Sequence, residues 1–413
     1  MLRVAVVGAG KFSAMFLSAA RTLEDARIVG VADLSEERAR ATLARVGWRD
    51  ERTEVTADAL SLIDGRRVDL VVEATGSPAA AAAHALKALE ERCHVVMVTA
   101  EVDALLGPLL AARAREAGVS YSLAYGDQPA LVWELVEWAR TCGFEVVCAG
   151  KGTKHLPAFH ASTPETVWEH YGLDPAYAAR EGLNAKLYNS FLDGTKSAIE
   201  MALVADATGL VPQDDGLRFP PCPADRLASV LNPGAALTRS GTVEVVSSLE
   251  LDGTPVENDL RWGVYVVFAT AEEHVRGWLA EYGVQTDEDG RFGALYRPSH
   301  LVGLELGVSV LRTARGEPTG TPSAFVADVV ATAKRDLAAG TLLDGEGGST
   351  VYGSLLPARR SLDVGALPVA LANGVRLTRD VAAGGPVRRA DVELDPNDLL
   401  VRLRAELETG FAP

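Results

Sequence analysis

Several features that mark particular protein classes are missing from this sequence. Its 413 residues include four cysteines, and no two of them form a C-x-x-C pair. A chain of this size does not need disulfide bonds, so we expect it to work in the reducing cytoplasm. No apolar run reaches the length of about 18 residues that a transmembrane helix needs. The sequence therefore excludes a disulfide-stapled domain, and no membrane span is expected.

Basic residues are scarce. Lysine and arginine together number 40 against 56 aspartates and glutamates, which gives a formal net charge of −16. The resulting negative potential repels nucleic acids and anionic membrane surfaces, so neither is expected as a partner. An anionic substrate would have to meet a local cluster of lysines or arginines.

Common catalytic signatures are also missing. The seven histidines show no H-E-x-x-H spacing, and the chain has neither a P-loop nor the G-x-S-x-G turn of a serine nucleophile. These gaps exclude the usual zinc proteases, P-loop nucleotide hydrolases and α/β-hydrolases. A metal site stays unknown at this stage.

What the sequence does contain is a long globular chain with 48% hydrophobic residues, enough for two or three domains. Up to residue 149, β-branched runs alternate with alanine-rich stretches, which is typical of a parallel sheet covered by helices. We predict an α/β fold that begins with a doubly wound Rossmann domain over residues 1–149. Its predicted strands are 2–7, 27–32, 68–73, 94–98, 119–123 and 145–149.

The sequence pattern changes after residue 149. Residues 150–333 combine loops, one strongly helical stretch at 187–207 and strand-like runs, which predicts an α+β substrate domain. Residues 334–413 have short strands, many glycines and polar turns, and predict a small β-rich module. We expect this module to take no part in the chemical step, so that a chain ending near Ala333 would still bind a dinucleotide.

A glycine-rich turn follows the first strand. Gly8 and Gly10 stand directly before a helical stretch, and Lys11 and Phe12 continue the turn. Such a strand–turn–helix lets the backbone approach a pyrophosphate, which then lies at the free N–H groups of the helix. Ser13 replaces the usual third glycine, and tight turns in any α/β protein also need glycine. These residues predict a dinucleotide site.

Asp33 ends the second strand, where a carboxylate can bind the ribose 2′-hydroxyl of NAD. The alternative is that Asp33 caps the following helix. Arg38 and Arg40 follow closely and could neutralise the 2′-phosphate of NADP. Asp33 favours NAD, and both cofactors stay open.

A second small-residue turn follows the third predicted strand. Ala74, Thr75, Gly76 and Ser77 would let the nicotinamide half of the dinucleotide pass close to the backbone. A simple loop with a serine helix start is the alternative. Two such turns with an acid between them favour a nicotinamide dinucleotide.

The junction near residue 150 carries a cluster of polar residues. Lys151, Thr153 and Lys154 stand where a cleft between domains is expected, and the two lysines could bind an anionic substrate. Solvated loop lysines are the alternative. His155 and His160 could also help to build this pocket.

The helical stretch 187–207 carries the candidate catalytic residues. Asp193, Lys196 and Glu200 have the spacing of one helix face, and the apolar residues around them favour a position beside a cleft. Lys196 could polarise a carbonyl or pass a proton, with Asp193 holding it in position, and with Glu200 and Asn189 as substrate contacts. A surface salt-bridge ladder is the alternative.

Longer strings resemble a known family. They are GAGKF at 8–12, EATGSP at 73–78, AYGDQPALVWELVEWAR at 124–140, GKGTKHLPAFHASTPETVWEHYGL at 150–173 and SFLDGTKSAIEMA at 190–202. They resemble the 1-deoxy-D-xylulose 5-phosphate reductoisomerase-like (DRL) oxidoreductases, distant relatives of homoserine dehydrogenase. The resemblance implies an NADPH-dependent reductase or reductoisomerase for a small polar oxo or hydroxy substrate, phosphorylated or carboxylated.

Further along, DLAAGTLLD at 336–344 and ALANGVRLT at 370–378 are similar to a SAF domain. One departure is evident: Val102 stands where homoserine dehydrogenases carry a lysine. Isomerisation usually requires a divalent metal held by carboxylates. The candidate ligands are Asp127, Glu134, Glu101 and Asp193, and their spacing in the sequence identifies no ligand set among them.

Three functions compete at this stage. The first is an NAD(P)H-dependent reductase or reductoisomerase, the second a homoserine-dehydrogenase-like enzyme without isomerisation, and a metal requirement would separate them. The third is a non-catalytic binding protein or chaperone that uses the SAF-like module. A small-molecule substrate and a homo-oligomer, paired through the strand-rich middle domain, are the expected partners.

Overall fold

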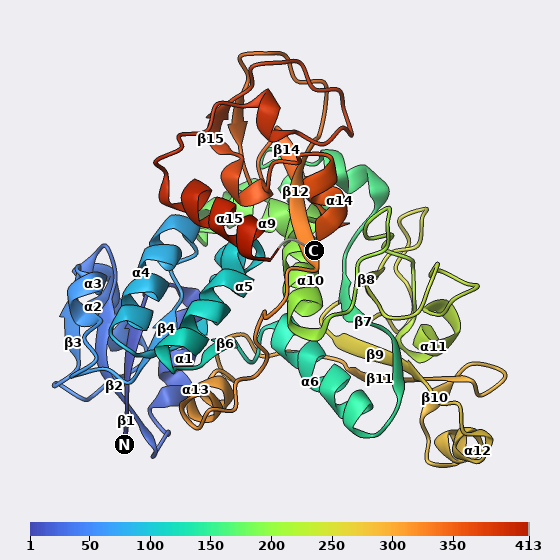
Figure 1. Ribbon diagram of the computed structural model, residues 1–413, viewed down its shortest axis with the longest axis horizontal. Coiled ribbons are helices and arrows are strands. Elements are labelled where there is room, and N and C mark those ends of the chain that lie inside the picture. The colour runs from blue at the N-terminus through green and yellow to red at the C-terminus, as the bar shows by residue number, and fades with distance from the viewer. Residues whose placement is uncertain (412–413) are drawn as a thin grey trace.

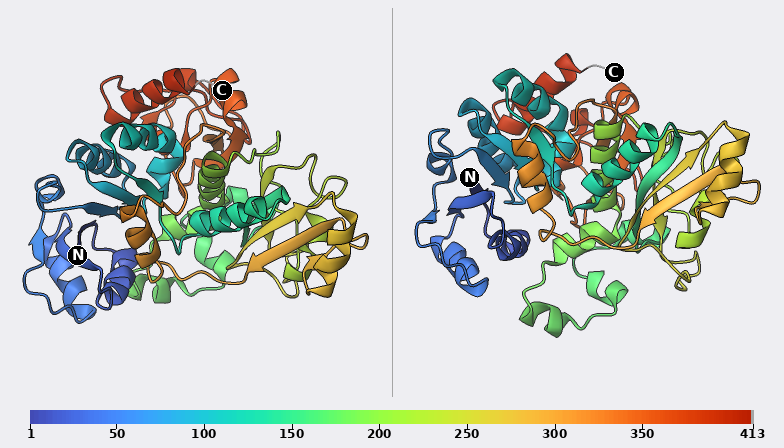
Figure 2. Two further views of the ribbon diagram at one scale, coloured as in Figure 1. Left: turned by 60° about the horizontal axis from the view of Figure 1, so that its bottom comes forward. Right: turned by 90° about the horizontal axis from the view of Figure 1, so that it is seen from below.

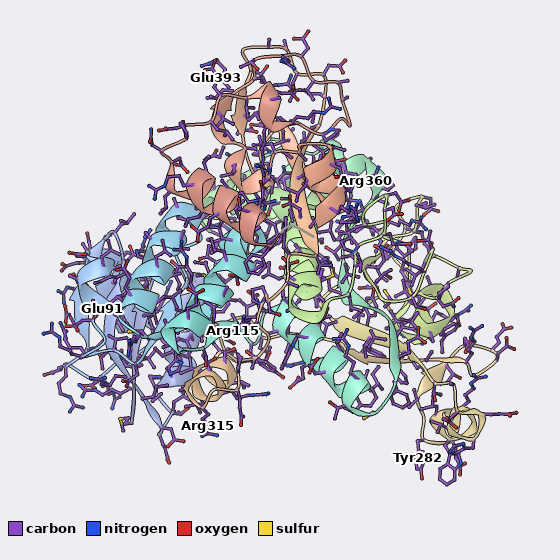
Figure 3. The ribbon with its side chains drawn as sticks, viewed as in Figure 1. Glu91, Arg115, Tyr282, Arg315, Arg360 and Glu393 are labelled. Carbon is purple, nitrogen blue, oxygen red and sulfur yellow. The ribbon has the colours of Figure 1, made fainter. Side chains whose placement is uncertain are left out.

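The computed structural model describes residues 1–411, and its three lobes follow one another along the chain (Figure 1). The blue N-terminal lobe holds a parallel sheet, a second sheet lies on the opposite side, and the red C-terminal module lies above both. The peripheral residues Glu91, Tyr282 and Glu393 mark these lobes in Figure 3. Helix α10 (Thr195–Thr208) runs where the lobes meet.

The N-terminal sheet has six parallel strands in the order β3-β2-β1-β4-β5-β6. They are β1 (Leu2–Val7), β2 (Ala26–Ala32), β3 (Glu54–Thr56), β4 (Leu70–Glu73), β5 (His94–Met97) and β6 (Tyr121–Leu123). The strand order reverses between β1 and β4, which opens a crevice at the carboxyl ends of these two strands. The predicted Rossmann fold is confirmed. Only the short, partly exposed β3 was not predicted.

Helices cover both faces of this sheet, and local residues set their ends. Ser35 caps α2 by accepting a hydrogen bond from the Arg38 backbone N–H at 3.2 Å. Pro78 opens α4 at a position where a backbone N–H would have no partner. Gly118 ends α5 with a φ of 73°, which favours glycine. The helices are α1 (Lys11–Ala20), α2 (Glu36–Arg45), α3 (Ala59–Leu62), α4 (Pro78–Glu90) and α5 (Ala100–Ala117).

Helix α13 (Gly307–Ala314) returns to the N-terminal lobe, as Figure 2 shows. The hydroxyl of Ser309 donates to the Leu123 carbonyl at 3.0 Å, and that of Thr321 donates to the Tyr121 carbonyl at 2.8 Å. The sequence assigned this helix to the second domain, but it packs against the first.

The second sheet has the order β10-β11-β9-β7-β8, with β7 parallel to β8 and antiparallel to β9. Its strands are β7 (Glu145–Thr153), β8 (Thr242–Ser247), β9 (Val264–Ala269), β10 (Gln285–Thr286) and β11 (Phe292–Arg297). Helices α6 (Gln128–Thr141) and α10 pack on it, as does α11 (Leu227–Val230). The segment 145–149 therefore belongs to this sheet, and its prediction as a Rossmann strand was wrong.

The predicted helix over 187–207 is two helices. Helix α9 (Ala185–Leu192) ends at Asp193, and α10 begins after Gly194, whose φ of 91° breaks the helical path. Asp193 therefore does not share a helix face with Lys196 and Glu200, and this part of the prediction was wrong. The remaining helices of the second lobe are α7 (Val167–Tyr171), α8 (Pro175–Arg180) and α12 (Glu273–Glu281).

The C-terminal module is built from two antiparallel strand pairs, as the β-rich prediction required. The pairs are β12 (Ala327–Ala333) with β14 (Val351–Pro357) and β13 (Leu342–Asp344) with β15 (Asn373–Arg376). Helices α14 (Ala358–Asp363) and α15 (Leu399–Gly410) complete it, and α15 packs on α5. Leu343 and Leu403 are buried in one hydrophobic core with Leu106 and Leu110 of α5. The module is therefore continuous with the N-terminal core.

A buried ion pair reinforces this junction. Arg404 of α15 donates to both carboxylate oxygens of Asp328 in β12, at 3.1 and 2.6 Å, and both side chains are 1% exposed. Arg404 also donates to Glu408 at 2.6 Å. Within residues 1–411, no helix combines the length and hydropathy that crossing a membrane requires.

Candidate active site

The glycine turn after β1 has the shape that the sequence predicts. Gly8 has a φ of 97°, and a Cβ there would lie 2.4 Å from the Ala74 carbonyl oxygen, so only glycine fits between the two turns. A Cβ at Gly10 would meet no atom within 4 Å. Gly10 opens α1, whose first turn has no acidic residue and no side-chain cap. The free N–H groups of α1 therefore face open space, which suits a pyrophosphate.

Asp33 lies beside this turn and is almost completely buried. Its carboxylate accepts hydrogen bonds from the backbone N–H groups of Ala9 and Ser35, each at 2.9 Å, and from Arg38 Nε at 3.0 Å. Burial raises the pKa of Asp33, but these bonds outweigh it, so the net pKa is lowered. Ser35 caps α2, so the alternative reading of Asp33 as the helix cap was wrong. The guanidinium of Arg38 is 61% exposed and could reach a 2′-phosphate.

The turn after β4 is organised by a carboxylate that the sequence did not single out. Glu73 is fully buried and accepts hydrogen bonds from the hydroxyls of Thr75 at 2.6 Å and Thr99 at 2.5 Å. Thr99 in turn accepts from the Gly76 N–H at 3.0 Å. These bonds fix the turn of Ala74–Ser77. The sequence feature that could have identified Glu73 is its position at the end of a predicted strand.

A cavity of about 470 Å³ opens beside this turn, and all three lobes line it. Thr75 and Gly76 come from the N-terminal domain, as does Glu101 at the start of α5. Lys186 comes from α9, and Glu346 from the C-terminal module. The predicted nicotinamide turn therefore forms one wall of an interdomain cavity.

Lys196 forms an ion pair with Glu101 of this cavity wall. Its ammonium lies 2.7 Å from a carboxylate oxygen of Glu101, and its side chain is 14% exposed. Burial alone would lower the pKa of Lys196, but Glu101, Glu346, Glu200 and Asp127 outweigh it and raise that pKa well above its ordinary value. Lys196 is therefore a permanent cation at neutral pH, suited to stabilising negative charge on a substrate oxygen.

Asp193 pairs with a lysine other than Lys196. Its carboxylate accepts from Lys334 of the C-terminal module at 2.8 Å and from the Thr195 N–H at 2.9 Å, and it is completely buried. The predicted role of Asp193 in holding Lys196 was therefore wrong, because Glu101 has that place. Lys334 was missed because the module was treated as separate from the chemistry.

The two lysines of the predicted anion clamp have partners within the protein. Lys151 lies in β7 and is ion-paired with Glu200 of α10, with both side chains buried. Lys154 donates to the His170 carbonyl at 2.7 Å and lies 5.5 Å from the centre of the Tyr171 ring. Burial is the largest influence that lowers the pKa of Lys154. Both lysines have internal partners, and Thr153 continues β7 beside β8.

Asn189 is also used internally. Its amide oxygen accepts from the Ser162 hydroxyl at 2.7 Å, and its nitrogen donates to the carbonyls of Ser162 at 3.1 Å and Gly347 at 3.0 Å. These bonds join α9 to the C-terminal module. We therefore assign Asn189 to this junction, and its role as a substrate contact stays a prediction.

The two histidines form an aromatic cluster next to Asp193. His155 stacks on Phe219 with ring centres 3.9 Å apart, and His160 stacks on Tyr352 at 4.4 Å. Burial and His160 lower the pKa of His155 to about 3, so His155 stays neutral. His160 lines a second, smaller cavity of about 100 Å³. His160 therefore helps to shape this neighbouring pocket, and His155 packs against Phe219 of its lining.

The candidate metal carboxylates do not converge. Throughout residues 1–411, no group of three or more His, Cys, Asp or Glu side chains is placed to hold a metal ion. Glu134 accepts from the Tyr125 hydroxyl at 2.6 Å, Glu101 binds Lys196 and Asp193 binds Lys334. Burial, and next the charge of Glu200, raise the pKa of Asp127 to about 7. The structure identifies none of the four as a metal ligand.

Solved structures match the chain at low identity and low TM-score. A probable dehydrogenase from Thermotoga maritima is 15% identical with a TM-score of 0.40, and the match covers 77% of this chain and 90% of that one. For myo-inositol dehydrogenase from Lactobacillus casei, the identity is 18% and the TM-score 0.31. That match covers 40% of this chain and half the length of the other. No curated protein matches the sequence.

Three family models match successive parts of the chain. The NAD-binding domain of homoserine dehydrogenase matches residues 7–124, the catalytic domain of oxidoreductase DRL matches residues 126–306, and the SAF domain matches residues 328–393. Their boundaries agree with the three lobes of the structure. The three models occur in the order that the resemblance to the DRL oxidoreductases predicts, with a homoserine dehydrogenase-type NAD-binding domain before the DRL catalytic domain and a SAF domain after it.

Proposed function

We propose that this NAD(P)-dependent oxidoreductase interconverts a hydroxyl and a carbonyl group on a small polar substrate held in the interdomain cavity. The observation that carries the proposal is the shared cavity. Thr75 and Gly76 of the NAD-binding domain line it together with Glu101, the partner of Lys196. A nicotinamide ring bound at this turn would supply or accept the hydride.

The chain's own residues have distinct tasks. Gly8 and Gly10 would leave room for the pyrophosphate of the cofactor, and Asp33 and Arg38 would bind at its adenosine ribose. Lys196 stabilises negative charge that develops on the substrate oxygen, and Glu101 fixes the lysine in place. Because burial strengthens such interactions, a positioned ammonium lowers the barrier more than it would in water.

The cavity lining bears on the substrate. Glu101 and Glu346 supply carboxyl groups, and Lys186 supplies a cation whose ammonium donates to the Asp344 carbonyl at 2.6 Å. A polyhydroxylated compound suits the carboxyl groups, and a phosphate or carboxylate group on it would bind at Lys186. Lys151 and Lys154 have no part in this proposal.

Reduction alone and reduction with isomerisation both remain compatible with this cavity. The discriminating experiment is turnover of NADPH and NADH with a panel of oxo acids and sugar phosphates, with and without EDTA. Activity that survives the chelator supports simple hydride transfer of the homoserine dehydrogenase type. A strict magnesium or manganese requirement with a rearranged product supports a reductoisomerase.

Replacing Gly10 by glutamate is expected to abolish dinucleotide binding. The new carboxylate would occupy the open space at the start of α1 and repel the pyrophosphate. At a cofactor concentration 100 times Kd, binding stabilises a protein by about 2.7 kcal/mol, which differential scanning fluorimetry detects. Gly10→Glu should lose this stabilisation with its own melting temperature unchanged, because a Cβ there meets nothing. Gly10→Ala is the control and should bind. Full stabilisation of Gly10→Glu would refute the cofactor site.

Asp33→Asn is expected to shift cofactor preference towards NADP. The change keeps the size of the side chain but removes the charge that would repel a 2′-phosphate, and it frees Arg38. The ratio of Kd for NADP to Kd for NAD should fall by about tenfold, or about 1.4 kcal/mol. Calorimetric titration measures both constants. Arg38→Ala should move the ratio the other way, and equal ratios in all three proteins would rule out this role for Asp33.

A further inference from the structure

A rigid loop of the C-terminal module reaches the cavity. It joins β13 to β14, and the carboxylate of Asp344 accepts from the N–H groups of Ser349 at 2.6 Å and Thr350 at 3.0 Å. Gly347 has a φ of 63°, and a Cβ on it would lie 2.0 Å from the Lys186 carbonyl oxygen. A Cβ on Gly348 would lie 2.2 Å from Asp344 Oδ1. The loop therefore needs both glycines to fit against itself and against α9.

Three side chains tie this loop to its surroundings. Lys186 donates to the Asp344 carbonyl at 2.6 Å, Asn189 to the Gly347 carbonyl at 3.0 Å and Lys334 to the Gly348 carbonyl at 2.7 Å. The backbone on both sides of Glu346 is thus fixed, and the side chain of Glu346 lines the cavity beside Glu101. This geometry holds one carboxyl group of the module at the proposed substrate site.

The charges around Lys196 do not balance if every group is ionised. Two ammonium groups, those of Lys151 and Lys196, pair with Glu200 and Glu101. Within residues 1–411, Asp127 and Glu346 lie near these pairs without an ion pair of their own. Desolvation without a counter-ion raises the pKa of a carboxyl group. Of these two, Glu346 lines the cavity.

The groups that face Glu346 support the same conclusion. Burial and the charge of Glu101 raise the pKa of Glu346 to about 8, whereas Lys196 of α10 and the hydroxyl of Ser190 in α9 lower it. Asp193 raises it further, and Asp344 and Lys186 are the remaining charged groups along the cavity wall. A carboxylic acid with such a pKa holds a proton at neutral pH and can release it to a stronger base.

We propose that Glu346 of the SAF domain is the proton donor and acceptor of the active site, while Lys196 acts only as a fixed charge. The proposal rests on the proposed function. When a carbonyl carbon gains a hydride from the reduced nicotinamide cofactor, its oxygen keeps the π electron pair as an alkoxide. The alkoxide forms an O–H bond with the proton of Glu346, whose O–H bond breaks to leave a carboxylate. Solvent then reprotonates Glu346, and oxidation runs these steps in reverse.

Infrared titration of the full-length protein tests the proton on Glu346 without a substrate. The spectrum of wild type minus that of Glu346→Gln should contain a protonated carboxyl band that disappears with a midpoint near pH 8. The matched control Glu393→Gln exchanges an exposed carboxylate of the same domain and should show no such band. A difference spectrum with no protonated carboxyl at pH 7 would overturn the proposal.

Kinetics test the role of that proton. The probe is NADPH-dependent reduction of whichever oxo acid or sugar phosphate of the panel the wild type reduces. Wild-type kcat should fall as the pH rises through the midpoint of Glu346, because the reaction needs the acid form. Glu346→Gln should lower kcat about 100-fold, and its kcat should no longer fall as the pH rises through this alkaline limb of the profile. Its cofactor Kd should be unchanged. An unchanged kcat, or a lowered kcat with the limb intact, would overturn the assignment. If wild-type protein binds no dinucleotide, the proposed function fails, and the infrared result still decides whether Glu346 holds a proton.

Discussion

Lys196→Ala is expected to reduce kcat by about 10²–10³, which corresponds to about 2.7–4 kcal/mol of lost transition-state stabilisation. The ammonium of Lys196 is held 2.7 Å from Glu101 before any substrate arrives, so its charge needs no reorganisation during the reaction. Removing it also leaves Glu101 without a partner, which places an uncompensated carboxylate on the cavity wall. Steady-state kinetics at saturating cofactor measure the loss.

Two controls separate this effect from general damage. Cofactor Kd should hardly change in Lys196→Ala, because the glycine turns lie on other elements. Lys154→Ala should retain kcat, since Lys154 donates to the His170 carbonyl. A Lys196→Ala enzyme with turnover within a factor of two of wild type would show that another group stabilises the substrate oxygen.

Arg404→Met is expected to lower the free energy of unfolding by about 3–5 kcal/mol, because it leaves Asp328 as a buried charge without its partner. Methionine keeps much of the aliphatic volume, so the loss reports the ion pair more than a cavity. Arg404 and Asp328 are both 1% exposed and joined by two hydrogen bonds. Urea unfolding followed by circular dichroism gives the change as a shift of the midpoint.

Arg402→Met is the matched control on the same helix, because Arg402 is exposed on α15. It should change stability by no more than about 0.5 kcal/mol. Equal, small losses in the two variants would mean that the junction between the C-terminal module and α5 depends on apolar packing alone.

The fold of the N-terminal domain could be predicted because its signals are local. The glycines at 8 and 10, the acid at 33 and the small-residue turn after β4 each lie at the end of a strand that hydrophobic residues define. Parallel strands bring these ends to one edge of the sheet. Local sequence patterns did not predict where the chain passes from the first sheet to the second. Residues 145–149 have the sequence of a strand, but nothing within them reveals which sheet they join.

The candidate site was predicted in part. Lys196 forms an ion pair with Glu101 of the cavity wall. Glu101 comes from another domain, and helix spacing cannot reveal such a contact. Glu346 and Lys334 were missed because composition separated their module from the rest. The glycines around Glu346 were a usable signal, since closely spaced glycines predict a tight turn and loops often carry functional residues. The expectation that a chain ending near Ala333 still binds a dinucleotide stays a prediction, and the core that the module shares with α5 makes the stability of such a chain part of its test.

The position of the last helix has a consequence for synthesis on the ribosome. The NAD-binding domain leaves the exit tunnel first and can fold early. Its helix α5 then lacks the packing partner α15 until the end of the chain has been made. The cavity likewise lacks one wall until the segment with Glu346 has emerged. We therefore expect a chain that stops before α15 to expose apolar surface on α5, which chaperones and proteases can recognise.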